Sequence, residues 1–159
     1  ASYFINLRII EVGGFQYELV SENPITKEKE ECIKMHVPKG ASLKEEDVRG
    51  SIRKSTYEIE RYFNVKDINY YIESWLLSPE VLALLDDNSN ILKFSKLFSI
   101  KSMGECTRDI LDFVFNDVYI KDYNLLVCKT SLQVKLKSLL INKKEIHIGI
   151  GKLKQVDQI

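Results

Sequence analysis

The sequence predicts a mixed α/β domain with one central mixed sheet flanked by helices. Three observations support this fold class: strand-like alternation near the start, a long amphipathic stretch at 43–63, and a short alternating segment near the end. The elements follow the order strand, strand, helix, strand, helices, strand, helix and strand, which is typical of a mixed layer rather than of repeated βαβ units. At 159 residues the chain is long enough for one domain with a single core.

The first strands are predicted from alternation and from turn residues. Residues 7–20 are strand-like and are interrupted by Gly13-Gly14, where the freedom of glycine at positive φ predicts a hairpin or a bulge. Residues 21–31 are polar and contain the turn signal Asn23-Pro24, so they predict a loop. Residues 32–37 predict the next strand, with Ile33 and Met35 on one face and Lys34 and His36 on the other.

A long helix is predicted at about 43–63. Ser42 with Glu45 three residues later forms the pattern of a capping box, which marks the helix start. One face of this helix carries residues at helical spacing, namely Val48, Ile52, Ser55, Ile59 and Phe63. We expect this face to pack on the sheet.

After the long helix, residues 69–77 predict a buried strand that holds Trp75 in the core. Ser78-Pro79 predicts an N-cap and first turn of a short helix that ends near residue 85. Ser89 predicts the start of another helix that ends near residue 98. Residues 100–103 and 113–115 are predicted strands.

The end of the chain carries a second capping-box pattern. Thr130 with Gln133 predicts the start of the last helix, and Leu136 and Leu140 lie on its apolar face. Residues 146–150 predict a closing strand, in which Gly149 and the following Gly151 indicate a close backbone approach.

Composition excludes several function classes. Lys plus Arg and Asp plus Glu each number 23, so no net charge attracts nucleic acid or an anionic membrane surface. The apolar runs are far below the ~20 residues that span a bilayer, and no signal peptide is visible, so we expect a soluble cytoplasmic protein. Three widely spaced cysteines and two histidines indicate free, buried thiols and no metal site.

Five short motifs occur in a fixed order along the chain: Gly14-Phe15-Gln16-Tyr17-Glu18, His36-Val37-Pro38, Ser74-Trp75-Leu76-Leu77, Ser89-Asn90-Ile91 and Thr130-Ser131-Leu132-Gln133. In this pattern the chain resembles the GNAT-like C-terminal domain of bacterial two-domain acyltransferases, over about residues 7–153. The resemblance implies a GNAT-like acyltransferase fold and a helical N-terminal domain as partner in the same polypeptide. Because the chain opens with Ala1 and no initiator Met, we expect residues 1–159 to be a single domain excised from that longer protein.

The resemblance also implies where a cofactor, acetyl-CoA or another acyl-CoA, would bind. In GNAT-type enzymes a strand, a turn and a helix N-terminus hold the thioester arm and the pyrophosphate, since free N–H groups and the helix dipole favour an anion. The corresponding residues here are Met35, Val37, Lys39, Gly40, Ala41, Ser42 and Leu43. The glycine-rich Q/R-x-x-G-x-G/A loop of that family is represented by one glycine only, Gly40, so an ordinary helix start is the alternative for this segment.

Two residues are candidate general bases. His36 lies on the strand that would line the acyl-transfer cleft, where imidazole removes a proton from an amine near neutral pH. Glu73 precedes the Ser74-Trp75 pair on the neighbouring strand and is the second candidate. The alternatives are a hydrogen-bonded structural histidine and a solvent-facing glutamate. His147 shows no acidic or cysteine partner in the sequence, and no role is assigned to it.

Two functions from different classes follow. The first is an acyl-CoA-dependent N-acyltransferase domain that takes a small-molecule acyl donor and an amine acceptor, with little activity expected from this chain alone. The second is a non-catalytic GNAT-like module that binds a ligand or packs against its helical companion domain, because fold does not determine function.

Overall fold

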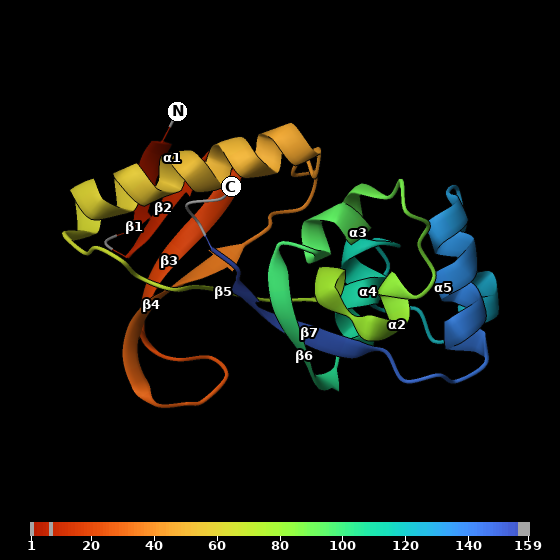
Figure 1. Ribbon diagram of the computed structural model, residues 1–159. Helices are drawn as coiled ribbons and strands as arrows, with labels where there is room; N and C mark the ends of the chain where they lie inside the picture. Colours follow the sequence, from red (N-terminus) through yellow and green to blue (C-terminus); the bar gives the residue numbers. More distant parts are fainter. Residues whose placement is uncertain (1, 7, 156–159) are drawn as a thin grey trace.

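The computed structural model describes residues 2–6 and 8–155, and its strands form one seven-stranded sheet in the order β1-β2-β3-β4-β5-β7-β6 (Figure 1). The strands span Ser2–Asn6 (β1), Ile9–Val12 (β2), Phe15–Glu22 (β3), Lys29–His36 (β4), Tyr70–Ser74 (β5), Phe98–Glu105 (β6) and His147–Leu153 (β7). Neighbouring strands are antiparallel except for β4 and β5, which are parallel. The predicted mixed sheet is therefore confirmed.

The helices divide into one long helix and several short ones. They span Glu45–Phe63 (α1), Pro79–Leu82 (α2), Asn90–Ser95 (α3), Thr107–Phe113 (α4) and Ser131–Ile141 (α5), with single 3₁₀ turns at Trp75–Leu77 and Tyr123–Leu125. α1 lies over β1 to β4, whereas α2 to α5 gather beside β5, β6 and β7 (Figure 1). The molecule thus has two halves joined along β4 and β5.

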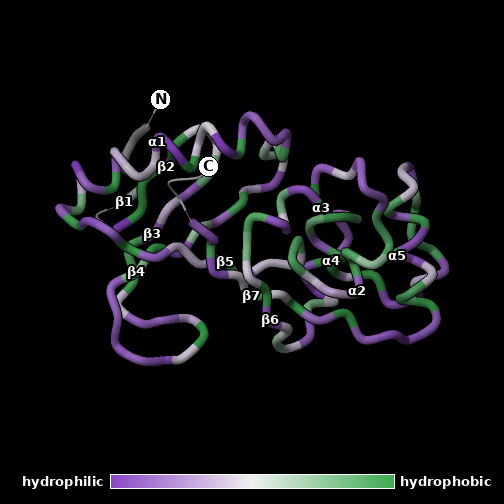
Figure 2. The backbone as a smooth tube through the Cα atoms, in the orientation of Figure 1, coloured by the Kyte–Doolittle hydropathy of each residue, from purple (hydrophilic) through white to green (hydrophobic). Residues whose placement is uncertain are grey.

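The first half begins with antiparallel hairpins. Gly13 and Gly14 have φ values of 57° and 84°, and they connect Val12 to its partner Phe15, so the predicted glycine hairpin is confirmed. Residue 7, where the first predicted strand begins, lies outside the described residues. The loop between β3 and β4 carries mostly hydrophilic residues (Figure 2), in agreement with the predicted polar connection.

The long helix packs as predicted but begins later. Val48, Ile52, Ser55 and Ile59 are all buried against the sheet, because their spacing places them on one face. The predicted capping box is wrong. The N-cap of α1 is Lys44, whose side chain makes no capping bond, while the Ser42 hydroxyl donates to the Asp47 carboxylate at 2.5 Å.

The second half departs further from the prediction. β5 ends at Ser74 and Trp75 begins a 3₁₀ turn, so the predicted strand over 69–77 is too long. The predicted strand at 113–115 is wrong, because Phe113 is the last residue of α4. Ile110 and Leu111 of this helix are buried in a core, and burying both of them on one side requires helical rather than extended backbone.

Capping and close approach in the second half agree with the sequence. Ser78 and Ser89 accept backbone N–H bonds at the starts of α2 and α3, and Thr130 with Gln133 forms a complete capping box at α5. A Cβ at Gly149 would lie 2.1 Å from the Leu77 carbonyl oxygen, so the predicted close backbone approach of the closing strand is confirmed.

Two hydrophobic clusters form the core, one under α1 and one among α2, α4 and α5. Trp75 is partly buried and packs against both clusters, so its predicted packing role in the core is confirmed. Cys32 and Cys106 are buried free thiols, whereas Cys128 is only half-buried, contrary to prediction. Over the described residues, no helix combines the length and apolar character that a membrane span requires.

Candidate functional site

The parallel pair β4 and β5 parts soon after it forms. Only Ile33 with Tyr70 and Lys34 with Tyr71 are in register, and no further pair joins the two strands among the described residues. Beyond them, Met35 and His36 continue β4 while Ile72 to Ser74 continue β5 toward β7. The separation leaves an opening in the sheet at the carboxyl ends of both strands.

A cleft of about 280 Å³ occupies this opening. β4 and the residues after it contribute His36, Val37 and Pro38, and β5 and the following turn contribute Glu73 and Trp75. Because the edges of two parting strands offer backbone N–H and C=O groups to the space between them, the cleft suits an extended amide-containing ligand. The two candidate bases predicted from sequence, His36 and Glu73, thus line one cleft.

His36 is held by a carboxylate that the sequence analysis did not identify. Its Nε2 lies 3.1 Å from Glu18 Oε1 on β3, and both side chains are about one-third exposed. In the strand register His36 opposes Gln16 and Glu18 opposes Lys34, so the pair is a diagonal cross-strand contact. Because the carboxylate accepts a hydrogen bond from Nε2–H, Nδ1 is left as the basic nitrogen of a neutral ring.

Glu73 faces a cation rather than an apolar wall. Its carboxylate lies 3.8 Å from Lys34 Nζ, and both side chains are about 30% exposed. The pair contributes little to stability at this exposure, yet it fixes an anion at the border of the cleft.

The turn between β4 and α1 contains the predicted anion site. Gly40 has a φ of 77°, and the Ala41 N–H donates to the Pro38 carbonyl at 3.1 Å. The Lys39 ammonium bonds Asp112 Oδ1 at 2.6 Å, so the lysine points toward α4. The segment therefore provides Lys39, a glycine turn and the start of α1, where Lys44 is the N-cap and the first turn carries Glu45, Glu46 and Asp47.

The remaining predicted cofactor residues occupy different places. Val37 lines the cleft, whereas Met35 is buried in the first hydrophobic cluster and is not among the residues that line the cleft. Ala41 and Leu43 pack against the first hydrophobic cluster, and Ser42 bonds Asp47. Of these five residues, Val37 alone lines the cleft, and the others pack on the core or support the turn.

One wall of the cleft comes from α4, a helix that the sequence analysis did not predict. Asp109 and Phe113 face the cleft from this helix. Burial, and then the neighbouring Asp112, raise the pKa of Asp109 above its ordinary value. The sequence signal for this helix was the apolar pair Ile110 and Leu111 among acidic residues. Two apolar neighbours alone do not distinguish a short helix from a strand.

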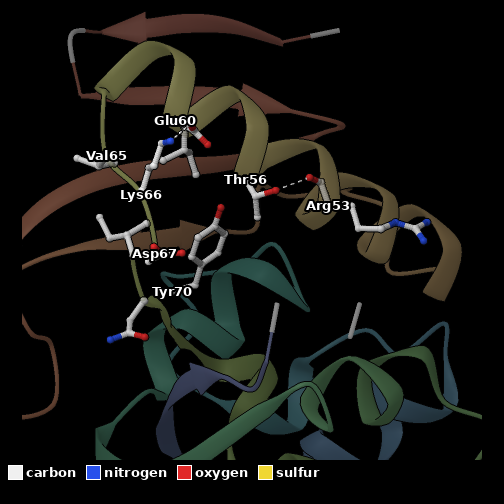
Figure 3. Close-up of a pocket in the computed structure, with 10 residues that line it drawn as sticks. Arg53, Thr56, Glu60, Val65, Lys66, Asp67 and Tyr70 are labelled. Carbon is white, nitrogen blue, oxygen red and sulfur yellow. Dashed lines mark hydrogen bonds and ion pairs between the residues drawn. The ribbon is translucent and has the colours of Figure 1, made fainter. Parts of the chain in front are cut away.

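A larger hollow of about 440 Å³ lies away from this cleft, between α1 and the loop that follows it. Lys66 pairs with Glu60 at 3.1 Å beside this hollow, and Figure 3 shows that Arg53 extends away from Tyr70. The Tyr70 hydroxyl bonds the buried Ser55 hydroxyl at 2.9 Å. The carboxylates of this hollow, Glu60 and Asp67, lie on α1 and in the loop after it and not where two strands part, so the β4–β5 cleft is the candidate reaction site.

His147 lies outside the cleft and has acidic partners, contrary to the sequence analysis. Its Nδ1 is 2.5 Å from Glu80 Oε1 and its Nε2 is 3.4 Å from Glu145 Oε2. The hydrogen bond with Glu80 raises the pKa of His147 above its ordinary value. Within the described ranges, no group of three His, Cys, Asp or Glu side chains is placed to hold a metal ion.

Comparisons with known proteins agree with this architecture. Residues 9–153 match a family described as the GNAT-like C-terminal domain. A search of curated proteins found no match. The fold is similar to that of an acyltransferase in complex with decanoyl-CoA, with a TM-score of 0.78 and 21% identity over 92% of this chain and 46% of the other.

Two further crystal structures are similar to the same degree, with TM-scores of 0.78. One is described as an acyltransferase in complex with CoA and 10C-teicoplanin, at 19% identity, and the other as an acyltransferase in complex with decanoyl-CoA and teicoplanin, at 20% identity. Each alignment covers 92% of this chain and 46% of the neighbour. The chain therefore spans less than half the length of these proteins.

Proposed function

Because the chain belongs to the GNAT-like C-terminal domain family, we propose that the β4–β5 cleft binds acyl-CoA and that the domain serves acyl transfer to an amine. The observation that carries this proposal is the opening between two parallel strands with His36 on its wall. Two of the similar crystal structures are of acyltransferases in complex with decanoyl-CoA, which supports acyl-CoA as the donor class here.

The chemistry of the proposal follows from the groups along the cleft. An amine attacks the thioester carbonyl, His36 accepts the proton that the amine loses, and the C–S bond breaks to release CoA as its thiolate, which is then protonated. Backbone N–H groups at the edge of β4 are the available donors for the carbonyl oxygen in this step. Glu73, paired with Lys34, would instead attract the acceptor as its ammonium ion.

The diphosphate of CoA is proposed to lie at residues 39–43. That position has the start of α1, the Lys39 ammonium and the Gly40 turn, which together favour an anion. Lys39→Glu should therefore weaken CoA binding measured by calorimetry. The same change at Lys154, at the far end of β7, is the matched control and should leave the affinity unchanged.

Binding and catalysis are tested separately. Thermal shift with acetyl-CoA and with decanoyl-CoA measures binding, since a ligand at a hundredfold excess over its Kd stabilises by about 2.7 kcal/mol. His36→Gln should preserve that shift and reduce acyl transfer by about 10²- to 10⁴-fold, the usual contribution of a general base. His147→Gln, a change outside the cleft, should preserve both.

The alternative function is a non-catalytic module that binds a ligand or packs on a companion domain. The turn with its single glycine favours this alternative. Acyl-CoA binding without any transfer by the longer protein would establish it, and loss of transfer in His36→Gln would exclude it.

We further propose that residues 1–159 form one domain of a longer polypeptide with a helical N-terminal domain. The lengths of the similar acyltransferases support this, because the chain covers 46% of them. The acceptor would then be held partly by the other domain, so the chain alone should show little turnover. Turnover of acetyl-CoA with a panel of amines at a rate matching the longer protein would contradict this part.

A further inference from the structure

Lys39 and Lys44 are the two cations between residues 38 and 44, and the ammonium of Lys39 is already engaged. It lies 2.6 Å from Asp112 Oδ1, 3.2 Å from Asn116 Oδ1 and 5.6 Å from the centroid of the Phe113 ring. These three partners lie on α4 and in the turn just after it. One lysine thus joins the turn before α1 to the helix on the opposite wall of the cleft.

The two ends of this contact flank the cleft. Pro38, next to Lys39, lines one side, and Phe113, next to Asp112, lines the other. Asp109 of the same helix also faces the cleft. α4 therefore brings two carboxylates to the end of the cleft where an anionic ligand would have to sit, and one of them neutralises the lysine.

We infer that the bridge from Lys39 to Asp112 and Asn116 is a latch that competes with the acyl-CoA diphosphate, so that Asp112 sets the affinity of the cleft for its donor. This inference rests on the proposed function. When the diphosphate binds, Lys39 exchanges Asp112 for phosphate oxygens. Without a diphosphate, Lys39 stays paired with Asp112 and Asn116.

The exposure of the ion pair makes this exchange easy. The side chains of Lys39 and Asp112 are 46% and 44% exposed, and ion pairs exposed to this degree are weak and are screened by salt. α4 itself remains anchored, because Ile110 and Leu111 are buried in the second hydrophobic cluster. The latch is therefore a change of side-chain partner and requires no unfolding of the helix.

The test is calorimetric binding of CoA to the whole chain at low and high salt. Removing the competing charge with Asp112→Asn should tighten CoA binding by about two- to fivefold at low salt, the range that corresponds to an exposed ion pair. Asp87→Asn is the charge-matched control, because Asp87 is exposed and lies outside the cleft. It should leave the affinity unchanged.

A second variant separates a latch from simple charge repulsion. Asn116 has a φ of 54°, so Asn116→Gly keeps the backbone while removing a neutral Lys39 partner. A latch predicts tighter CoA binding in this variant as well, by up to about twofold, since a neutral contact is weaker than the ion pair. Tightening in Asp112→Asn alone would show long-range repulsion and overturn the latch.

The two proposals fail in different ways. If the wild-type chain binds CoA and neither α4 variant binds it more tightly, the latch is wrong and the proposed function stands. If wild-type protein and all variants fail to bind CoA at millimolar concentration, the proposed donor site is wrong, and the latch is then wrong as well.

Discussion

The two halves of the fold stabilise their helices in different ways. In the first half, the 19-residue α1 begins without any side-chain cap, while its buried face packs on β2 and β3. In the second half, α2 and α3 have four and six residues, and each begins at a serine that accepts a backbone N–H bond. In the first half, the long apolar stripe of α1 stabilises the helix without a cap. In the second half, serine caps stabilise helices that are too short to carry such a stripe.

This difference explains where the cleft lies. β4 belongs to the half built from hairpins and α1, whereas β5 continues into the 3₁₀ turn and the short helices. Each strand follows the packing of its own half after two shared register pairs. The cleft is therefore the place where two differently packed halves separate, and Trp75 contacts both hydrophobic clusters beside it.

The largest expected effect tests the close packing of the second half. Gly149→Ala would place a Cβ 2.1 Å from the Leu77 carbonyl oxygen, and backbone cannot move aside cheaply there. We expect a loss of at least about 3 kcal/mol, at the upper end of overpacking changes. Denaturant unfolding measures it, and a midpoint equal to that of the parent would show that β7 and the 3₁₀ turn are not packed this tightly.

Gly50→Ala in α1 is the matched control from the first half. A Cβ at Gly50 meets nothing within 4 Å, and alanine is favoured over glycine inside a helix. This variant should be more stable than the parent by up to about 1 kcal/mol. The same substitution thus has opposite signs in the two halves.

The next prediction concerns the tryptophan between the halves. Trp75→Ala removes contacts with both hydrophobic clusters, but the side chain is only partly buried. We expect a loss of about 2 to 3 kcal/mol, below the usual range for a fully buried tryptophan. Tyr57→Ala, at a residue that is 66% exposed, should cost much less in the same urea titration. Equal losses would mean that Trp75 does not join the two halves.

A smaller effect on stability is expected when the two predicted capping boxes are each removed by mutation. Thr130→Ala removes an observed cap of α5 and should cost about 1 kcal/mol. Ser42→Ala removes a serine that does not cap α1, so thermal unfolding should show a change within about 0.5 kcal/mol. A larger loss at Ser42 than at Thr130 would reverse this difference between the halves.

Local sequence rules predicted most of the fold. They failed at the start of α1 and at α4, where packing decides the backbone conformation. Ser78, Ser89 and Thr130 were correctly identified as caps, because each is followed directly by a helix. Ser42 has the same signature, yet the chain reaches its helical path only at Glu45, after Leu43 packs on the core. The 107–113 helix was missed because its burial against α2 and α5 is a tertiary effect that the local sequence does not contain.

Only one wall of the candidate site could be predicted from the sequence. His36 and Glu73 follow from the strand pattern and the family resemblance, and the structure brings both to the cleft. Glu18 contacts His36 across the β3–β4 register, and register depends on the hairpin loop between them. Asp109 and Phe113 reach the cleft from a distant part of the chain, so no local signal could have placed them there.

The smallest effect concerns an ion pair that joins α2 to β7 within the second half. Hydrogen bonding to Glu80 raises the pKa of His147 above its ordinary value of 6.5. The protonated ring therefore stabilises the folded state below about pH 6.5, and this contribution is lost as pH rises through the higher pKa of the folded protein. Burial acts to raise the pKa of Glu80, but the bonds from His147 outweigh it and the pKa is lowered, so Glu80 stays charged throughout this range.

Unfolding midpoints at about pH 5.5 and about pH 8.5 measure this contribution. The wild-type protein should lose more stability between these values than Glu80→Gln, which has no carboxylate to hold the protonated ring. Glu145→Gln is the control, because that carboxylate is 75% exposed and lies farther from the ring, at 3.4 Å. It should retain most of the wild-type dependence. Identical pH dependence in wild type and Glu80→Gln would show that this pair does not link α2 to β7, and caps with apolar packing would then be sufficient for the second half.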